Sequence, residues 1–238
     1  MTSYPSKYLE LHLKQEIHLF YNWEEIPTSI KIMIPTSWIN VLQSIPFLKK
    51  GMLDLWKTEN YKADIFINSL IEMCQDIALV TNQNGSILGL LYILQHKITD
   101  KIHNVGWLGN LPASEQDISE SAIRMGIHQL PFDYQSFVRI HNGFLMDGWN
   151  SVGIRSTDKI YFIDATSLKE NENVVVNFNP TAILAFCGDG NGNEQSFLLQ
   201  GSNFLDDGIS FRWDHETKNI KNPLPFWEFI ATHIGKQM

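Results

Sequence analysis

The spacing of apolar residues in the first half of the chain predicts helices followed by strands. A helix is expected from Trp38, after an N-cap at Thr36-Ser37, and two more are expected over residues 52–56 and 63–74. Residues 6–21 fit both the twofold alternation of a strand and the spacing of a helix, so this segment stays open between the two.

Three strands are expected after these helices. Residues 77–81 and 87–94 are apolar, and between them lies Asn84-Gly85, a pair that favours the tight turn of a β-hairpin. Residues 102–108 supply a third strand. The first half therefore predicts an α/β unit that ends in a three-stranded meander.

A change in composition marks a boundary near residue 112. Residues 112–129 contain a proline, several acidic residues and a short amphipathic pattern, which predicts a helix after the boundary. We therefore divide the chain into an N-terminal α/β extension over residues 1–112 and a second domain over residues 113–238.

The segment from Leu130 to Phe144 predicts a complete short helix. Pro131 suits the first turn, where its missing N–H is no loss, and Asp133 suits the positive end of the helix dipole. Asn142-Gly143 should end the helix, because either residue adopts the left-handed conformation of a C-cap. One buried stripe should contain Tyr134, Phe137, Val138 and either Ile140 or His141.

Two apolar runs further along the chain flank a glycine-rich segment. The runs are Ile183–Phe186 and Phe197–Leu199, and residues 188–193 between them read GDGNGN. Glycine adopts positive φ without steric cost, and Asn and Asp side chains bond to nearby backbone groups. The pattern predicts two paired strands joined by a turn.

Four motifs of the second half, in this order, resemble the SUKH superfamily. They are L-P-x-D-Y-x-x-F with H-N-G over residues 130–143, the strand and glycine-rich turn over 183–193, F-R-W-D-H-E at 211–216, and F-W-E-F-I at 226–230. This superfamily joins fungal regulators of cell-wall glucan synthesis to bacterial toxin-immunity and SecY-interacting proteins. The resemblance covers about residues 115–238.

The resemblance implies an α+β fold in which helices flank an antiparallel sheet and a last helix closes the domain. Bacterial members of the superfamily mostly bind and block toxins, and the superfamily is not known for a catalytic residue set. The extension before residue 113 departs from the family, which leaves open whether it is a separate module or joins the same sheet. Ten positions carry over as determinants of the fold: Leu130, Pro131, Asp133, Tyr134, Phe137, Asn142, Gly143, Gly188, Gly192 and Asn193.

The order of elements in the first half also resembles, loosely, the front half of an N-acetyltransferase. The segment V-G-W-L-G-N-L at 105–111 suits the fourth strand of that fold. Such enzymes hold the pyrophosphate of coenzyme A on a Gln/Arg-x-x-Gly-x-Gly/Ala loop, which this sequence lacks. Acetyl transfer is therefore not predicted, although an acetyltransferase-like enzyme stays the alternative from another class.

The acidity of the chain belongs to its second half. Of the net charge of −8, residues 1–114 contribute −1, with 9 basic and 10 acidic residues, and residues 115–238 contribute −7, with 9 and 16. Such a surface disfavours nucleic acid and speeds the encounter with a basic protein. An acidity that serves solubility alone is the alternative.

Other features set the cellular and chemical class. The chain has no apolar run that would span a membrane and no secretion signal at its start, so we expect a cytoplasmic protein without a membrane partner. Cys74 and Cys187 lie far apart and are expected to be small buried side chains. HExxH, GxSxG and Walker motifs do not occur.

Two segments are similar to sites but fit turns better. Residues 189–200 begin like a calcium loop, yet Glu194 stands where the loop needs glycine and Gln200 where it needs a carboxylate. Side chains of Asp214-His215-Glu216 would alternate between the faces of a strand, so residues 214–218 indicate a polar hairpin turn. We expect no catalytic residues, no metal and no cofactor.

Protein binding remains as the predicted function. Residues 144–150 and 204–208, expected to be loops, mix aromatic and acidic side chains, as protein interfaces do. We hypothesise a non-catalytic bacterial immunity protein that neutralises a basic toxin; a regulatory or scaffold protein of cell-wall synthesis is the alternative. The partner, the binding face and the oligomeric state stay open. The candidate partner-binding residues are Asp147, Trp149, Asp189, Asn191, Asp206 and Asp207.

Overall fold

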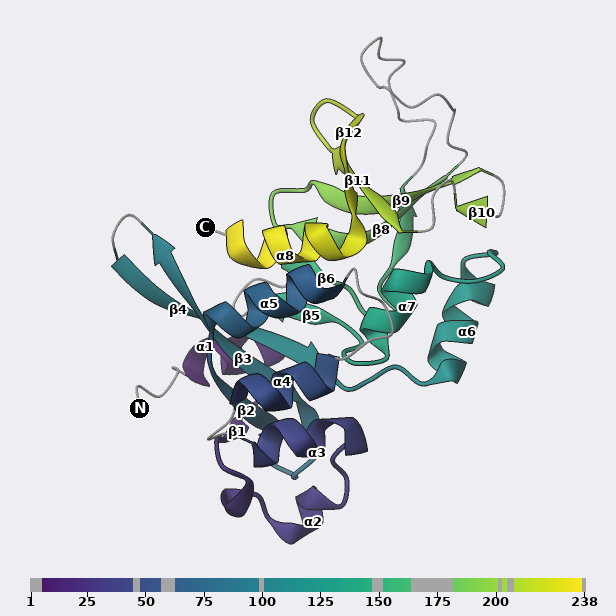
Figure 1. Ribbon diagram of the computed structural model, residues 1–238. Coiled ribbons are helices and arrows are strands. Elements are labelled where there is room, and N and C mark those ends of the chain that lie inside the picture. The colour runs from purple at the N-terminus through teal and green to yellow at the C-terminus, as the bar shows by residue number, and fades with distance from the viewer. Residues whose placement is uncertain are drawn as a thin grey trace.

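Strands from both halves of the chain form one antiparallel sheet (Figure 1). The computed structural model describes residues 6–44, 48–56, 63–98, 101–146, 152–163, 182–200, 203–204 and 208–236. The strands of the described residues are β1 (Ile17–Phe20), β2 (Cys74–Asn82), β3 (Ile87–Ile98), β4 (Lys101–Asn110), β5 (Phe144–Met146), β6 (Val152–Ile154), β7 (Tyr161–Ile163), β8 (Ala182–Asp189), β9 (Glu194–Gln200), β10 (Asn203–Phe204), β11 (Ile209–Asp214) and β12 (Asn219–Pro225). Their order is β1-β2-β3-β4-β5-β6-β8-β9-β11-β12, with β7 paired to β8 and β10 to β9.

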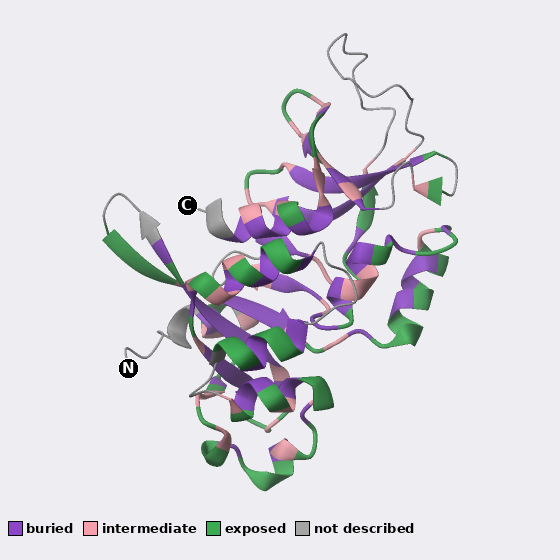
Figure 2. Ribbon diagram, in the orientation of Figure 1, coloured by how far each residue is buried: buried purple, intermediate pink, exposed green. Residues whose placement is uncertain are grey.

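Helices cover this sheet mainly on one face. They are α1 (Ser6–Leu13), the 3₁₀ helix η1 (Trp23–Glu25), α2 (Thr28–Lys31), α3 (Thr36–Gln43), α4 (Leu48–Trp56), α5 (Asp64–Met73), α6 (Glu115–Arg124), α7 (Phe132–Val138) and α8 (Phe226–Lys236). Apolar side chains of α3 to α8 share one core with the strands, whereas Leu9 of α1 packs on the opposite face of β2 and β3. Figure 2 shows helices buried on their sheet side and exposed on the other. The predicted α+β class is confirmed.

Most elements expected in the first half are present. The segment left open at 6–21 contains both candidates, because α1 ends at Leu13 and β1 begins at Ile17. Helices α3, α4 and α5 cover the three predicted helical segments. The predicted cap at Thr36-Ser37 was wrong: Pro35 is the N-cap of α3, with extended backbone and no side-chain hydrogen bond.

The predicted three-stranded meander is confirmed as β2, β3 and β4. The turn between β2 and β3 is held by the side chain of Asn82, whose Oδ1 accepts hydrogen bonds from the backbone N–H groups of Asn84 and Ser86. Gly85 has a φ of 79°, which glycine adopts at no steric cost. Local turn chemistry therefore fixes this hairpin.

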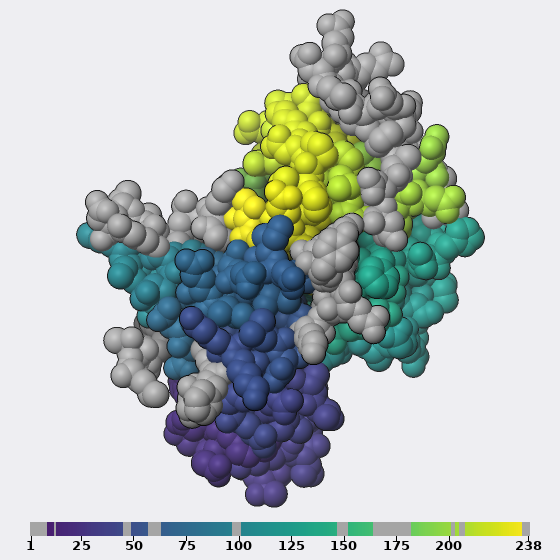
Figure 3. Space-filling view, viewed as in Figure 1, coloured from purple at the N-terminus to yellow at the C-terminus, as the bar shows by residue number. Residues whose placement is uncertain are grey.

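The sheet continues across the position where the sequence changes composition. Strand β4 pairs with β5, so that Trp107, Leu108 and Gly109 face Met146, Leu145 and Phe144. Residues 144–146 were expected to be loop, and that expectation was wrong, because Phe144 is fully buried and its strand completes the sheet beside β4. Figure 3 shows a second contact between the two halves, where α5 lies against α8. The boundary placed at residues 112 and 113 stays a prediction.

A buried hydrogen-bonded histidine lies beside this junction. The Nε2 atom of His141 is 2.7 Å from the hydroxyl of Tyr92 on β3, and its Nδ1 atom is 3.1 Å from the carbonyl oxygen of Asn110. The imidazole fits because residue 109 is glycine: a Cβ there would lie 2.5 Å from Nδ1 of His141. The two halves thus share polar as well as apolar contacts.

Helix α7 matches its prediction except at its ends. The expected stripe is buried, and both candidates for its last position, Ile140 and His141, are buried as well. Pro131 lies one residue earlier than expected, as the N-cap. The helix ends at Val138, before Asn142-Gly143, and Gly143 takes its positive φ of 104° in the following turn. Within the described ranges, no helix combines the length and apolar character needed to cross a bilayer.

Candidate partner-binding site

The turn between β8 and β9 is built around the carboxylate of Asp189. Its Oδ1 accepts hydrogen bonds from the backbone N–H groups of Asn191 and Asn193, at 2.8 and 3.1 Å. Its Oδ2 accepts from Nδ2 of Asn193 at 2.7 Å and from Nη2 of Arg212 at 3.3 Å. Gly190 and Gly192 have φ values of 81° and 89°. The predicted strand-turn-strand is confirmed, and four donors occupy the acceptor sites of Asp189.

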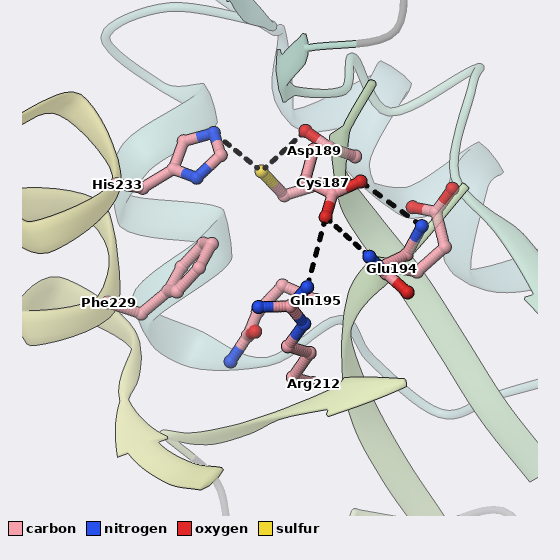
Figure 4. A pocket seen from close by; sticks show the side chains of 9 residues that line it. Cys187, Asp189, Glu194, Gln195, Arg212, Phe229 and His233 are labelled. Atoms are coloured by element: carbon pink, nitrogen blue, oxygen red, sulfur yellow. Dashed lines mark hydrogen bonds and ion pairs between the residues drawn. The ribbon is translucent and has the colours of Figure 1, made fainter. Parts of the chain in front are cut away.

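Helix α8 lies opposite this turn, with Phe229 and His233 directed towards it (Figure 4). Phe229 and His233 lie one helical turn apart, with ring centroids separated by 5.1 Å. The Nε2 atom of His233 is 3.6 Å from Sγ of Cys187 on β8. The helix is held in place by its apolar face, since Phe226 and Trp227 are fully buried.

A hollow lies between this helix and the strands. Its two adjoining parts have volumes of about 80 and 250 Å³ and share Asp189, Gln195, Arg212, Phe229 and His233. The smaller part reaches Cys187 and Asn193, and the larger part is also lined by Asn222, Leu224 and Thr232. Sites for whole small molecules start at roughly 300 Å³, and each part taken alone lies below that volume, so either part has room for a single side chain.

The thiol and imidazole in the hollow are both uncharged at neutral pH. Burial raises the pKa of the Cys187 thiol well above its ordinary range, and burial lowers the pKa of His233 to about 4. A cysteine nucleophile acts as a thiolate, and catalytic cysteines obtain it from a charged or basic neighbour. Burial therefore favours the neutral thiol of Cys187 over the thiolate in the resting protein.

The second carboxylate at the hollow is also committed to internal contacts. Arg155 donates two hydrogen bonds to Glu194, at 2.5 and 2.9 Å, and the hydroxyl of Tyr161 donates a third at 2.9 Å. Burial raises the pKa of Glu194, and the hydrogen bonds from Arg155 oppose that shift. The cluster ties β7 and the end of β6 to β9, so Glu194 serves the fold. In the described residues, no group of three or more His, Cys, Asp or Glu side chains is arranged to hold a metal ion.

The structure separates the predicted partner-binding residues into two groups. Asp189 and Asn191 lie in the turn. Asn191 is exposed, and its backbone N–H donates a hydrogen bond to the carboxylate of Asp189. The other four lie outside the described residues: Asp147, Trp149, Asp206 and Asp207. Asp189 therefore stabilises its own turn, as the glycine-rich pattern predicted.

Three of the positions carried over as fold determinants make hydrogen bonds between elements. The hydroxyl of Tyr134 donates to the carbonyl of Arg155 at 2.9 Å, and Oδ1 of Asn142 accepts from the backbone of Thr157 at 2.7 Å. Asn193 accepts from the backbone N–H of His215 at 3.2 Å, which joins the β8–β9 turn to the β11–β12 turn. The predicted polar turn at 214–218 is confirmed.

Two polar residues of the hollow carried no signal in the sequence. Gln195 is buried in β9 and donates from Nε2 to Oγ of Ser210 at 2.8 Å. His233 is a single histidine in an amphipathic helix, and only the packing of α8 against β8 brings it to Cys187. Arg212 and Phe229 stood in the motifs at 211–216 and 226–230, but without any sign that they face one another.

The start of α6 follows β4, the place where an N-acetyltransferase would hold its pyrophosphate. Here Ser114 and Asp117 form a capping box: the side chain of Ser114 accepts from the backbone of Asp117 at 3.1 Å, and Asp117 accepts from the backbone of Ser114 at 2.8 Å. A carboxylate of the chain itself thus occupies the anion-favouring end of the helix. This arrangement disfavours a phosphate ligand there.

Removal of this cap should lower stability modestly. We expect Ser114→Ala to reduce the free energy of unfolding by about 1 kcal/mol, because one N-terminal N–H of α6 loses its acceptor. Urea unfolding followed by circular dichroism measures the change. Ser119→Ala, an exposed serine in the middle of the same helix, is the matched control and should not destabilise the protein. Equal losses in the two variants would contradict a capping role.

Comparison of the chain with protein-family models, with curated proteins and with solved structures found no match.

Proposed function

We propose that this chain is a non-catalytic protein-binding protein, of the kind that neutralises a toxin in bacterial immunity. The proposal rests on the side chains that line the hollow beside α8, on which of them are already paired and which are exposed. The thiol of the hollow is held in the neutral form by burial, and its two carboxylates are paired with arginines, while Arg212 and Phe229 remain partly exposed at its wall. Arginine and aromatic side chains at a concave surface favour recognition of another protein.

The charge of the second half supports a basic partner. Residues 115–238 carry a net charge of −7, against −1 for residues 1–114. Complementary charge speeds the encounter of two proteins and makes it sensitive to salt. Toxins that act on nucleic acid need basic surfaces, because they must bind phosphates.

The arrangement of elements is also what the SUKH resemblance leads one to expect. The four motifs fall on helix α7, on the β8–β9 hairpin, on β11 with its turn, and on the closing helix α8. This correspondence supports the resemblance without identifying the partner. A regulatory or scaffold protein would use the same binding surface, so the nature of the captured partner has to decide between the two roles.

A pull-down from the source cells tests the proposal. Full-length protein is the bait, captured partners are identified by mass spectrometry, and the capture is repeated over a series of salt concentrations. We expect a basic partner whose toxicity the protein suppresses when both are co-expressed, and whose capture weakens as salt rises.

Charge-reversal variants locate the contact. Glu216→Lys with Glu228→Lys reverses two exposed acids of the second half, in the β11–β12 turn and on α8. This pair should weaken binding about tenfold. Glu24→Lys with Glu72→Lys makes the same charge change on exposed acids of the first half and should have little effect. Capture of only neutral or acidic partners, or equal losses in the two double variants, would overturn the proposal.

A further inference from the structure

We propose that the hollow beside α8 receives the side-chain carboxylate of an aspartate or glutamate from the protein partner, with Arg212 as its counter-charge. This inference rests on the proposed function, because it names what the partner inserts. It concerns the shared hollow of Asp189, Gln195, Arg212, Phe229 and His233. In Figure 4, Gln195 and Arg212 lie on the strand side of this space and Phe229 and His233 on the helix side.

Arg212 has more hydrogen-bond donors than its contact with Asp189 uses. A guanidinium group has five N–H donors, and in the described residues Asp189 is the one acceptor that Arg212 contacts, at 3.3 Å. That contact is long because the carboxylate already accepts three shorter hydrogen bonds from its own turn. With 46% of its side chain exposed, Arg212 retains donors for an external acceptor. A carboxylate matches their planar geometry with two parallel bonds.

The acidic side chains that line the hollow are each paired with an arginine. Asp189 and Glu194 are the acids that line the hollow, and they pair with Arg212 and Arg155 respectively. These four charges balance, and burial keeps the imidazole of His233 neutral at pH 7. An incoming carboxylate would share Arg212 with Asp189, and the N–H donors of Arg212 that Asp189 does not use would have to compensate the added negative charge.

The hollow has an apolar side as well as a polar one. Phe229 and Leu224 are partly buried and give the larger part an apolar side, next to a volume of about 250 Å³. That space accommodates the methylene stem of an acidic side chain. A phosphate group would need several cationic or backbone donors, whereas the lining of the larger part contains one arginine and no lysine.

Such a contact would fix the register of a partner that is otherwise basic. A cationic surface is drawn to the acidic half of the chain at many positions of similar energy, because charge attraction has little directionality. A single acid among the partner's cations would be accepted in the hollow at Arg212. An arginine within a concave surface surrounded by acids would thus select one orientation.

The test uses the full-length protein and four probes. They are glutamate capped at both ends as N-acetyl and N-methylamide, glutamine capped in the same way, N-acetyl-leucine with its free terminal carboxylate, and inorganic phosphate. The readout is the set of ¹⁵N-NMR shifts of the Arg212 side chain and of the backbone of Phe229. Capped glutamate should give saturable shifts, with a dissociation constant at least about tenfold lower than that of capped glutamine.

Two variants separate the pocket from general charge. Arg212→Gln should raise the dissociation constant for capped glutamate about tenfold or more, and Arg212→Lys should give an intermediate loss, because lysine keeps the charge and loses the two parallel bonds. Lys221→Gln removes the same charge from the neighbouring strand, where Lys221 pairs with Asp214 at 3.2 Å, and should leave binding unchanged. Thermal unfolding of each variant checks that the fold is intact.

Several results would overturn the inference. They are equal binding of capped glutamate and capped glutamine, preference for N-acetyl-leucine or phosphate, no saturable shift with any probe, or unchanged affinity in Arg212→Gln. If a basic partner is still captured and depends on Glu216 and Glu228 while capped glutamate fails to bind, the carboxylate pocket is rejected and the protein-binding function stands. If no such partner is captured, the proposed function itself fails.

Discussion

Separate expression of residues 1–112 and 113–238 should give two polypeptides that do not fold alone. The aromatic core crosses this division: the ring of Trp56 lies 5.4 Å from Phe137 and 6.4 Å from Phe144, and Trp38 lies 5.3 Å from His141. The Nε1 atom of Trp38 also donates to the carbonyl of Ile140 at 3.3 Å. Each fragment would expose large side chains that are fully buried in the whole chain, and each would turn a central strand of the sheet, β4 or β5, into an edge strand.

Circular dichroism and amide NMR of each fragment measure this outcome. We expect narrow amide dispersion and no cooperative unfolding from either fragment, and recovery of dispersed signals when the two are refolded together. The intact chain under the same conditions is the control. A cooperative unfolding transition from residues 113–238 alone would contradict the prediction and would support an independent second domain.

The elements that the sequence predicted best are those fixed by neighbours along the chain. The β2–β3 hairpin depends on Asn82 and Gly85 at its own turn, and the β8–β9 hairpin depends on the bonds between Asp189 and Asn193. Helix α7 shows its apolar face as a stripe three to four residues apart. In each case the residues that decide the structure lie within a few positions of one another, so the pattern is visible without the fold.

The elements that the sequence missed depend on distant partners. Strand β5 has only three residues, Phe144–Met146, and becomes a strand because β4 on one side and β6 on the other supply its hydrogen bonds. The pairing of β4 with β5 also decides that the first half joins the sheet of the second. The spacing of apolar residues along the chain does not indicate that β4 pairs with β5. The relation between the two halves therefore stayed open in the sequence analysis.

The candidate site was only partly visible for the same reason. Asp189 was predicted to bind a partner, but its carboxylate accepts hydrogen bonds from the backbone of its own turn. The residues that face the hollow come from three separate elements, with Gln195 on β9, Arg212 on β11 and His233 on α8. Their proximity follows from the strand order and from the position of α8, neither of which any motif encodes.

Acidification from pH 7 to pH 5 should lower the free energy of unfolding, and two buried histidines should contribute about 4 kcal/mol to that loss. Burial lowers the pKa of His141 to about 3 and that of His233 to about 4, against about 6.5 in an unfolded chain. Both groups have a depressed pKa in the folded state, so the folded protein binds fewer protons. Their contribution to stability is complete above pH 6.5 and is lost as the pH falls towards 4, at about 2 kcal/mol for each histidine by pH 5.

The neutral form of His141 is also fixed by its partners. The carbonyl of Asn110 can only accept, so Nδ1 carries the hydrogen, and Nε2 is left to accept from the hydroxyl of Tyr92. Trp38 and Trp56 contact the same ring, and the described contacts of the imidazole include no carboxylate that would compensate a positive charge. Protonation would therefore place an unpaired cation in the aromatic core, which the unfolded chain avoids.

Urea unfolding at pH 7 and at pH 5 measures this linkage. The readout is the difference in unfolding free energy between the two pH values, because each variant then serves as its own reference for any change in packing. We expect His233→Gln to reduce that difference by about 2 kcal/mol, because the contribution of its imidazole is removed. His128→Gln removes an exposed histidine and should leave the difference at the value of the unmodified protein. A pH difference unchanged in His233→Gln would mean that other groups cause the loss, and that the imidazole beside Cys187 is not held neutral by burial.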